Sequence, residues 1–440
     1  MNNLSVNPSI KVNLKKRYWF EIFFKSCCYA AITFLFVIIF VMFSNLISNA
    51  LSALKKYEIE ARVYINSDLI KNKDYSKIYD SALQPFVSNE EDVIILKSLI
   101  SDSAILDIRR LAEAACSREC EGDLERSSEA YKEAGLYKAS NILKLKHQLS
   151  YKDNCIKIKL PLNSLSTEYL KGNFNSNNLT KSQISILESL KKSNYIKLNF
   201  NYSLFNNSDS RYSEKAGLKV ALIGSIFTIL ICIAVSLPIA LITSIYLEEF
   251  APQNKFSNFI ELTISNLASV PSIVFGLIGL ILFIEFYQFP RSSSIAAGLT
   301  LSLIILPIMI FNFRQAIRSV PKSLKENVLA LGISKMQVVM HHILPLTFPA
   351  ILNGIIIAIT RAIGETAPLI LIGMVAFIIN SPKNIFSATT VLPTQIYLWA
   401  NSPEIAFKNK VSVAILLLVF IIIFLNIIVI FIRKKYEKKL

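Results

Sequence analysis

Long runs of apolar residues alternate with polar segments along the chain. A predominantly apolar run of about 18 residues or more can cross a bilayer as a helix. Six runs of this kind cover residues 27–47, 216–246, 259–287, 292–312, 349–379 and 411–432. The first run is longer than the core of a signal peptide, and no small-residue cleavage site follows it closely. The pattern therefore predicts six transmembrane helices, of which the first is not removed.

The polar region between the first two runs has the pattern of a separate domain. Apolar and polar residues alternate over 156–160 and 196–204, which predicts two half-buried strands. Ser88 with Glu91, and Thr180 with Gln183, form capping boxes before apolar residues at helical spacing. We expect an inserted α+β domain on the outer side of the membrane.

Composition and charge support this interpretation and orient the chain. The sequence is 53% hydrophobic and 18% charged, whereas soluble proteins are about 25% charged. The net charge is +16, but residues 50–214 hold 24 Lys and Arg against 22 Asp and Glu. The excess positive charge therefore lies beside the apolar runs. This distribution indicates charges that set the orientation of the membrane helices, and we expect no nucleic-acid partner. With the N-terminus inside, the short inner segments carry 16 Lys and Arg and the short outer loops 4.

These observations predict an order of parts. A cytoplasmic tail over 1–26 precedes a first transmembrane helix over 27–48 and an extracytoplasmic domain over 49–214. A five-helix core over 215–435 and a cytoplasmic tail over 436–440 follow. The expected protein is an all-α integral membrane protein with an added α+β domain, and membrane lipid surrounds its helices.

The cysteines do not form a recognisable site. Cys116, Cys120 and Cys155 lie in the polar region, and their odd number leaves all three disulfide pairings open. No CxxC pair or HExxH motif occurs in the sequence. We therefore expect no metal and no cofactor.

The segment over 319–348 predicts two short amphipathic helices between two spans. Pro321 and a capping box of Ser323 and Glu326 indicate the start of the first helix, and Leu331 lies on its apolar face. Gly332 is a residue that commonly follows the end of a helix.

The second helix of this segment has its own signals. Ser334 and Gln337 form another capping box, and Pro345 is expected to end the helix. The apolar stripe either packs on the ends of the chain's own helices or binds a soluble partner.

The spacing of Glu326, Gly332, Leu344 and Pro345 resembles the EAA coupling loop of binding-protein-dependent ABC importer permeases. In that family the loop inserts into a groove on the ATPase. The two alanines of the usual loop are replaced here by Asn327 and Val328. The resemblance implies that Ser323, Leu331 and Ser334 belong to the same coupling surface.

Four further motifs resemble the A-type permease of phosphate-specific ABC importers. They are SIYLEE (244–249), ASVPSIVFGL (268–277), RAIGETAPL (361–369) and VLPTQIYLWANSP (391–403). The similarity covers about 216–435. It implies a MetI-like fold, a homologous second permease, a dimer of ATP-binding subunits and a periplasmic phosphate-binding protein.

Two opposite charges lie in the fifth apolar run. Arg361 and Glu365 are four residues apart, and a charge inside a membrane usually faces a cavity or a partner. They form either a salt bridge that locks the helix or a contact on an anion pathway. We expect Thr366 to disturb the helix beside them and Gly364 to allow a close backbone approach.

The sequence thus predicts a phosphate permease of the bacterial cytoplasmic membrane, with alternating access driven by a partner. No phosphate-binding G-x-x-x-x-G-K-[ST] loop occurs, so we expect a transport subunit rather than an enzyme. A permease for another oxyanion and a membrane receptor that senses through its outer domain remain as alternatives.

Overall fold

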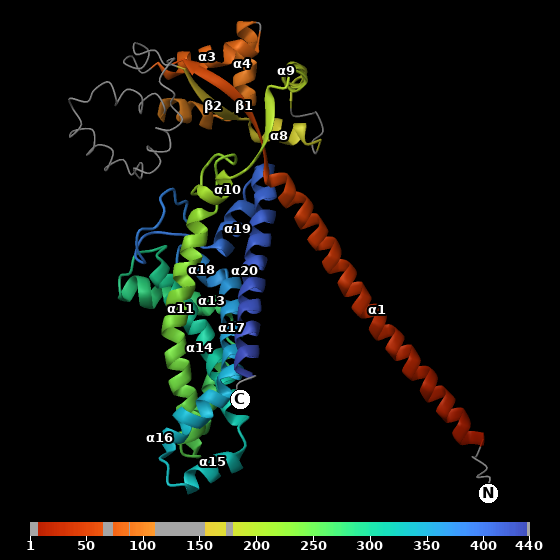
Figure 1. Ribbon diagram of the computed structural model, residues 1–440, viewed down its shortest axis with the longest axis vertical. Coiled ribbons are helices and arrows are strands. Elements are labelled where there is room, and N and C mark those ends of the chain that lie inside the picture. Colours follow the sequence, from red (N-terminus) through yellow and green to blue (C-terminus); the bar gives the residue numbers. More distant parts are fainter. Residues whose placement is uncertain (1–7, 65–73, 88, 111–154, 173–178, 438–440) are drawn as a thin grey trace.

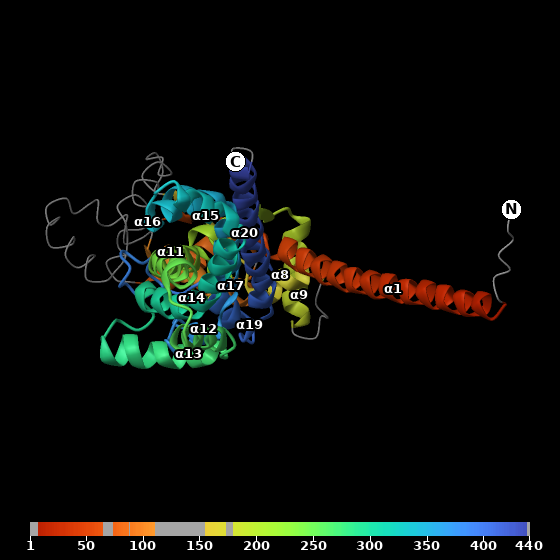
Figure 2. The same cartoon turned by 90° about the horizontal axis from the view of Figure 1, so that it is seen from below.

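The computed structural model describes residues 8–64, 74–87, 89–110, 155–172 and 179–437. Figure 1 shows a small domain of strands and short helices above a bundle of long helices. A single long helix, α1 (Pro8–Ala53), leans away from this bundle. The view from below confirms that α1 diverges from the other helices (Figure 2).

Helix α1 is attached to the bundle only near its end. Its large apolar side chains between Tyr18 and Ile47 are exposed, whereas Ala50 and Ala53 are buried. The two alanines pack with Leu204 and Trp399 in one small apolar cluster. A helix that is apolar on all sides requires lipid or another protein around it. The helix extends beyond the expected bounds of 27–48 at both ends.

The small domain is built on a three-stranded antiparallel sheet. The central strand β1 (Lys55–Tyr64) follows α1 almost directly and lies between β2 (Cys155–Pro161) and β3 (Ile196–Phe200). The register places Ala61 opposite Ile158, and Lys55 opposite Phe200. The predicted α+β fold is confirmed.

One of the two predicted strands is shorter than expected. Strand β3 ends at Phe200, and Ser203–Asn206 form the short helix α10 rather than a continuation of the strand. The backbone N–H of Asn201 donates to the carbonyl of Leu54 at 2.8 Å. This bond directs the chain back toward α1 and the bundle.

Short helices cover the sheet and enclose its core. They are α3 (Tyr75–Leu83), η1 (Gln84–Phe86), α4 (Glu90–Leu99), α8 (Ser164–Leu170) and α9 (Lys181–Lys192). The Thr180–Gln183 capping box forms at the start of α9. Helix α4 follows Asn89, and Ser88 lies outside the described residues, as do Cys116 and Cys120.

Polar contacts fix this domain on the bundle. The amide of Asn409 donates to the buried Glu168 carboxylate at 2.8 Å. The Lys410 ammonium donates to the carbonyl of Ala216 at 2.5 Å and lies over the ring of Trp399. Asn409 and Lys410 belong to the last long helix, α20 (Ile405–Glu437). The domain is therefore attached to this helix as well as through the chain segments that connect it to α1 and α11.

The bundle contains long helices joined by shorter helical segments. In chain order they are α11 (Lys219–Ile245), η3 (Tyr246–Phe250), α12 (Lys255–Ala268), α13 (Ser272–Gly279), η4 (Leu280–Phe286), α14 (Ser294–Arg318), α15 (Lys322–Ala330), α16 (Lys335–Val338), η5 (Val339–Ile343), α17 (Leu344–Gly364), α18 (Ala367–Leu371), α19 (Leu392–Ala400) and α20 (Ile405–Glu437). The η3, η4 and η5 segments are π-helical turns that continue a preceding helix.

Five helices of the described chain are long and apolar enough to cross a membrane. They are Arg17–Ala53, Lys219–Phe250, Ser294–Arg318, Lys335–Gly364 and Ile405–Tyr436. A sixth crossing is made only if a bent pair of helices counts as one span.

This bent pair corrects the single span predicted over 259–287. Lys255–Ala268 and Ser272–Phe286 meet at an angle of 99°. Pro271 lies at the break, where a proline disfavours helical geometry in the residue before it. The apolar run is therefore two helical pieces rather than one.

The predicted span over 349–379 is also corrected. Helix α17 ends at Gly364, and the short helix α18 follows after two residues. Residues 372–391 contain no helix in the described chain. Pro368 lies in the first turn of α18, where its ring suits a helix start. The apolar run therefore contains most of the spanning helix α17, the short helix α18 and a segment without helix.

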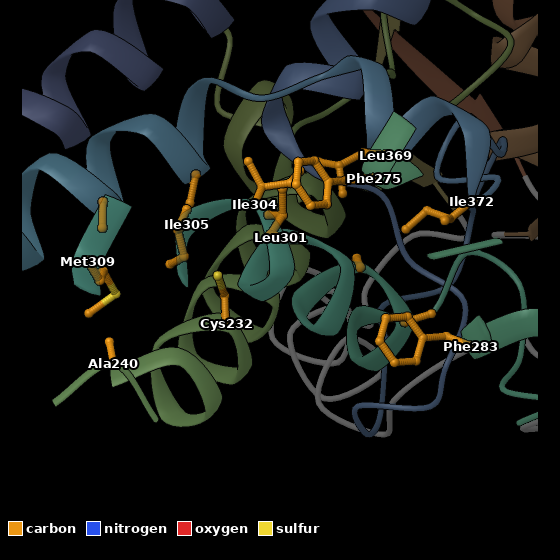
Figure 3. Packing of buried hydrophobic residues seen from close by; sticks show 14 of the residues in the cluster. Cys232, Ala240, Phe275, Phe283, Leu301, Ile304, Ile305, Met309, Leu369 and Ile372 are labelled. Carbon is orange, nitrogen blue, oxygen red and sulfur yellow. The ribbon is translucent and has the colours of Figure 1, made fainter. Parts of the chain in front are cut away.

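The bundle core is packed from α11, α14 and the segment around α18. Figure 3 shows Cys232 of α11 facing Leu301, Ile304 and Ile305 of α14, with Leu369 beside them. These side chains are at most 3% exposed. Gly298 permits the close approach of the two helices, because a Cβ there would lie 2.7 Å from the Ile231 side chain.

Candidate functional site

The segment over 319–348 forms two short helices at the end of the bundle opposite the sheet (Figure 1). Helix α15 ends at Ala330, Gly332 follows with φ of +80°, and the Ser334–Gln337 capping box begins α16. Both features agree with the sequence. A positive φ is costly for any residue with a Cβ, so glycine suits the turn between the two helices.

Two details of this segment differ from the prediction. Helix α15 begins at Lys322, and Pro321 precedes it without a side-chain cap, so Ser323 and Glu326 form no capping box. Pro345 does not end the second helix, because it occupies the first turn of α17 and Leu344 continues the helix from η5. Because the helix is continuous here, the proline removes one backbone hydrogen bond within it without ending it.

The apolar stripe of this segment has a buried side and an exposed side. Val338, Val339 and Ile343 are at most 2% exposed and pack on Ile317 and Val320 at the end of α14. The exposed side is formed by three residues: Leu331 at 78%, Met336 at 55% and Met340 at 50%. The segment thus rests on its own bundle and presents a second apolar surface.

A network of ion pairs joins the helix ends beneath this segment. Arg314 Nε donates to Glu248 Oε1 at 2.7 Å, and Arg314 Nη2 lies 2.9 Å from Glu261 Oε2. Arg318 Nη2 lies 3.0 Å from the same oxygen of Glu248. The side chains of Arg314 and Glu248 are only 11% and 10% exposed. One arginine therefore connects α14 with η3, at the end of α11, and with the middle of α12.

A second contact links the network directly to α15. The ammonium of Lys325 pairs with the carboxylate of Glu249, whose side chain is 9% exposed. Lys335, at the start of α16, lies over the ring of Phe250, 5.4 Å from its centroid. The π-helical turn η3 is thus in contact with both short helices, and a displacement of either helix acts on α11.

Arg361 and Glu365 lie at the point where α17 ends. Arg361 Nε is 3.4 Å from Glu365 Oε1, with side chains 42% and 18% exposed. Glu365 follows the last helical residue and has an extended backbone, with φ of −76° and ψ of 120°. The structure therefore forms the predicted pair, but at a helix break rather than along one continuous helix.

The close backbone approach expected at Gly364 is not found there. A Cβ at Gly364 would meet nothing within 4 Å in the described chain, so no neighbouring backbone approaches there. The close approach occurs instead at Gly276 of α13, where a Cβ would lie 2.6 Å from Pro368 Cα. Helix α13 thus packs closely against α18 at Pro368. Thr366 lies in the connection between α17 and α18.

The sequence reasoning missed the ion-pair network. Glu248 and Arg314 are 66 residues apart, so no local spacing relates them. Only the positions of the two residues indicated that they could meet. Each follows the end of an apolar run, and both run ends lie on the same side of the predicted membrane. The side chain of Glu261 is 45% exposed while it binds Arg314.

The sequence of residues 236–440 matches the family model described as the binding-protein-dependent transport system inner membrane component. A "Probable ABC transporter permease protein YqgI" of Bacillus subtilis is 31% identical over 44% of this chain and 70% of its own length. The chain belongs to this family of ABC permeases. It is therefore a multi-pass transport component of the inner membrane rather than an enzyme.

Other permeases of the family are similar over the same part of the chain. The "Phosphate transport system permease protein PstA 1" of Mycobacterium tuberculosis is 31% identical over 48% of this chain and 68% of its own. The PstA protein of Haemophilus influenzae is 30% identical over 51% of this chain and 78% of its own. Each of these two matches covers about half of this chain.

The N-terminal part has a separate match. Residues 11–115 match a domain of unknown function, DUF3333. Among solved structures, the inward-facing MetNI methionine ABC transporter is similar with a TM-score of 0.39 and 16% identity, over 50% of this chain and 94% of that one. The additional N-terminal region thus lies outside the part that the permease family model matches.

Proposed function

We propose that this permease moves inorganic phosphate into the cytoplasm by alternating access, driven by a separate ATPase. The observation that carries the proposal is the Arg361–Glu365 pair, with side chains 42% and 18% exposed, at the break between the spanning helix α17 and the short helix α18. The pair lies within the RAIGETAPL motif at 361–369. The similarity to permeases of phosphate transport systems supports phosphate as the substrate.

Arg361 supplies the positive contact for the anion in this proposal. A guanidinium presents a planar fork of donors that matches the oxygens of an oxyanion. Glu365 holds the guanidinium and weakens its hold on the anion, because conduction requires release as well as binding. The 42% exposure of Arg361 leaves room for an anion beside it.

A second chain completes the pathway. Arg361 is exposed on the surface of this single chain, and a homologous permease would enclose it from the other side. A periplasmic phosphate-binding protein would deliver phosphate at the end that carries the sheet. The N-terminal end of α1 and the C-terminal end of α20 both point away from the sheet, toward the level of α15 and α16, which supports cytoplasmic termini (Figure 1).

The segment over 319–348 is the coupling element in this proposal. Its exposed surface of Leu331, Met336 and Met340 suits a groove on a dimer of ATP-binding subunits. Closure of the dimer would displace α15. The pairs Lys325–Glu249 and Arg314–Glu248 would transmit that displacement to α11 and α14.

Site-specific crosslinking tests the coupling role against the receptor alternative. In a variant with Cys27 and Cys28 changed to Ser, Leu331→Cys should crosslink to a co-purifying ATPase. Ile94→Cys is the matched control, because Ile94 is 69% exposed on the outer domain. Crosslinking of Leu331→Cys to a signalling protein instead of an ATPase would favour the receptor.

A permease for another oxyanion remains the second candidate for the substrate. An arginine fork binds sulfate as readily as phosphate on chemical grounds, so the pair alone does not select between them. Competition distinguishes them: excess sulfate should leave labelled phosphate uptake unchanged. If sulfate suppresses the uptake as strongly as unlabelled phosphate does, the substrate assignment is overturned.

A further inference from the structure

An apolar crevice lies between α11 and α20 in the half of the bundle nearest the sheet. Its volume is about 160 Å³. Leu222, Ile226 and Ile229 of α11 form one wall, and Leu418 and Ile421 of α20 form the other. Ile226 is 56% exposed, so the crevice opens on the outer surface of the bundle. An apolar cavity of about 150 Å³ stays dry and binds hydrocarbons.

The inner end of the crevice reaches the segment that carries the proposed anion site. Ala362, Ile363 and Leu369 line it, and these residues flank the break between α17 and α18. The lining is too apolar for an inorganic anion, whose burial without donors is strongly unfavourable. The occupant must therefore be a hydrocarbon chain, and between two spans the hydrocarbon at hand is lipid.

The position of a lysine on α11 shows where the head of such a lipid lies. Lys219 is the first residue of α11, is exposed, and has no ion-pair partner among the described side chains. Lys219, Leu222, Ile226 and Ile229 follow a spacing of three and four, which places them on one helix face. Ile229 lies about 15 Å along the helix from Lys219, roughly half the hydrocarbon thickness.

A buried hydroxyl inside the crevice is an independent sign of a ligand. Thr228 lines the crevice and is 1% exposed, yet its Oγ1 has no hydrogen-bond partner in the part of the chain that the structure describes. Buried hydroxyls nearly always have a partner. Ser225, one turn nearer to Lys219, also lines the crevice. The Ser225 hydroxyl, about 9 Å along the helix from Lys219, is near enough to the headgroup end to donate to an ester carbonyl of a lipid.

From these observations we infer that the crevice binds one chain of an anionic phospholipid, with its headgroup phosphate at Lys219. The occupied crevice supports Ala362 and Ile363 from the lipid side, next to the break after Gly364. The lipid therefore stabilises the end of α17, and it does so whichever anion the permease carries.

Lipid retention on the intact complex tests this inference. The permease, purified with its partner proteins, is incubated with equal amounts of phosphatidylglycerol and phosphatidylcholine and examined by native mass spectrometry. We expect one phosphatidylglycerol to be retained in preference to phosphatidylcholine. Lys219→Gln should reduce that preference about fivefold, the contribution of one cation near an anionic headgroup.

A variant that fills the crevice gives the second readout. Ile226→Trp should abolish retention of both lipids. Ile242→Trp, at a similarly exposed position on α11 away from the crevice, should bind as the wild type does, and so should Lys255→Gln. Equal retention of the two lipids by the wild type, or unchanged retention in Ile226→Trp, would overturn the inference.

Discussion

Arg314 Nε donates to Glu248 Oε1 across 2.7 Å, at a point where both side chains are about nine-tenths buried. This bond joins α14 to the end of α11, the two helices that form most of the bundle core. The same arginine reaches Glu261 in the middle of α12, so the ends of α11 and α14 and the middle of α12 share one cation. A buried cation held by two carboxylates fixes the relative position of these ends.

Removal of one carboxylate from this network should destabilise the permease. Glu248→Gln removes the buried carboxylate and leaves Arg314 and Arg318 only the 45% exposed Glu261, and loss of one partner of a buried pair costs about 3 kcal/mol. Thermal unfolding in nanodiscs measures the loss. Glu285→Gln is the control, because Glu285 and Arg291 form a pair with side chains 60% and 69% exposed. The control should cost less than about 1 kcal/mol, and equal losses in both variants would refute the role of the network.

Substitutions at Gly332 and Gly364 distinguish the cost of a strained backbone conformation from the cost of a steric clash. A Cβ would meet nothing within 4 Å at either position, but only Gly332 has a positive φ. Gly332→Ala should therefore cost about 1–2 kcal/mol and loosen the segment between α15 and α16. Gly364→Ala, in a helical residue, should be neutral or slightly stabilising.

Hydrogen exchange of residues 322–343 measures this difference. Faster exchange in Gly332→Ala than in Gly364→Ala is the expected result. Identical exchange in the two variants would show that the turn does not depend on the left-handed conformation.

Gly224 of α11 should not accept a side chain. A Cβ at this position would lie 2.1 Å from the carbonyl oxygen of Thr390 and 2.4 Å from the hydroxyl of Thr389. Gly224→Ala must therefore displace the segment before α19, at a cost of about 1–3 kcal/mol. The yield of folded protein on size exclusion should fall, and a wild-type yield would contradict the close packing of α11 against this segment.

Local signals in the sequence predicted local structure correctly. The capping boxes at Thr180 and Ser334 form as expected, because each involves residues within one helical turn. The box at Ser323 does not form, since Pro321 allows α15 to begin one residue earlier than Ser323. Four of the six apolar runs coincide with helices long and apolar enough to cross a membrane, and the polar region between the first two runs contains the sheet.

Breaks within the apolar runs were not predictable in the same way. Pro271 and Pro368 each lie in an apolar run, where proline is compatible with a kinked helix or with a complete break. The outcome at Pro368 depends on its contact with Gly276, which is distant in sequence. The ion pairs of Arg314 depend on tertiary packing for the same reason.

Arg361 should be required for transport but not for folding. Arg361→Gln removes the guanidinium fork, and loss of a charged hydrogen bond of this kind reduces a rate about tenfold or more. Assembly with the partner proteins should remain intact, because Gln keeps a polar side chain of similar length next to Glu365. Arg291→Gln, an exposed arginine near the sheet end of the bundle, should transport at the wild-type rate. Wild-type uptake in Arg361→Gln would remove Arg361 from the pathway.

The most direct test of the account is uptake of labelled phosphate by proteoliposomes. They would contain the permease with its second permease and ATPase, with the phosphate-binding protein outside and ATP inside. We predict saturable phosphate accumulation that requires hydrolysable ATP and is unaffected by sulfate. An assembled complex that hydrolyses ATP without accumulating phosphate would contradict the proposed substrate, and accumulation that does not require ATP would contradict the proposed coupling.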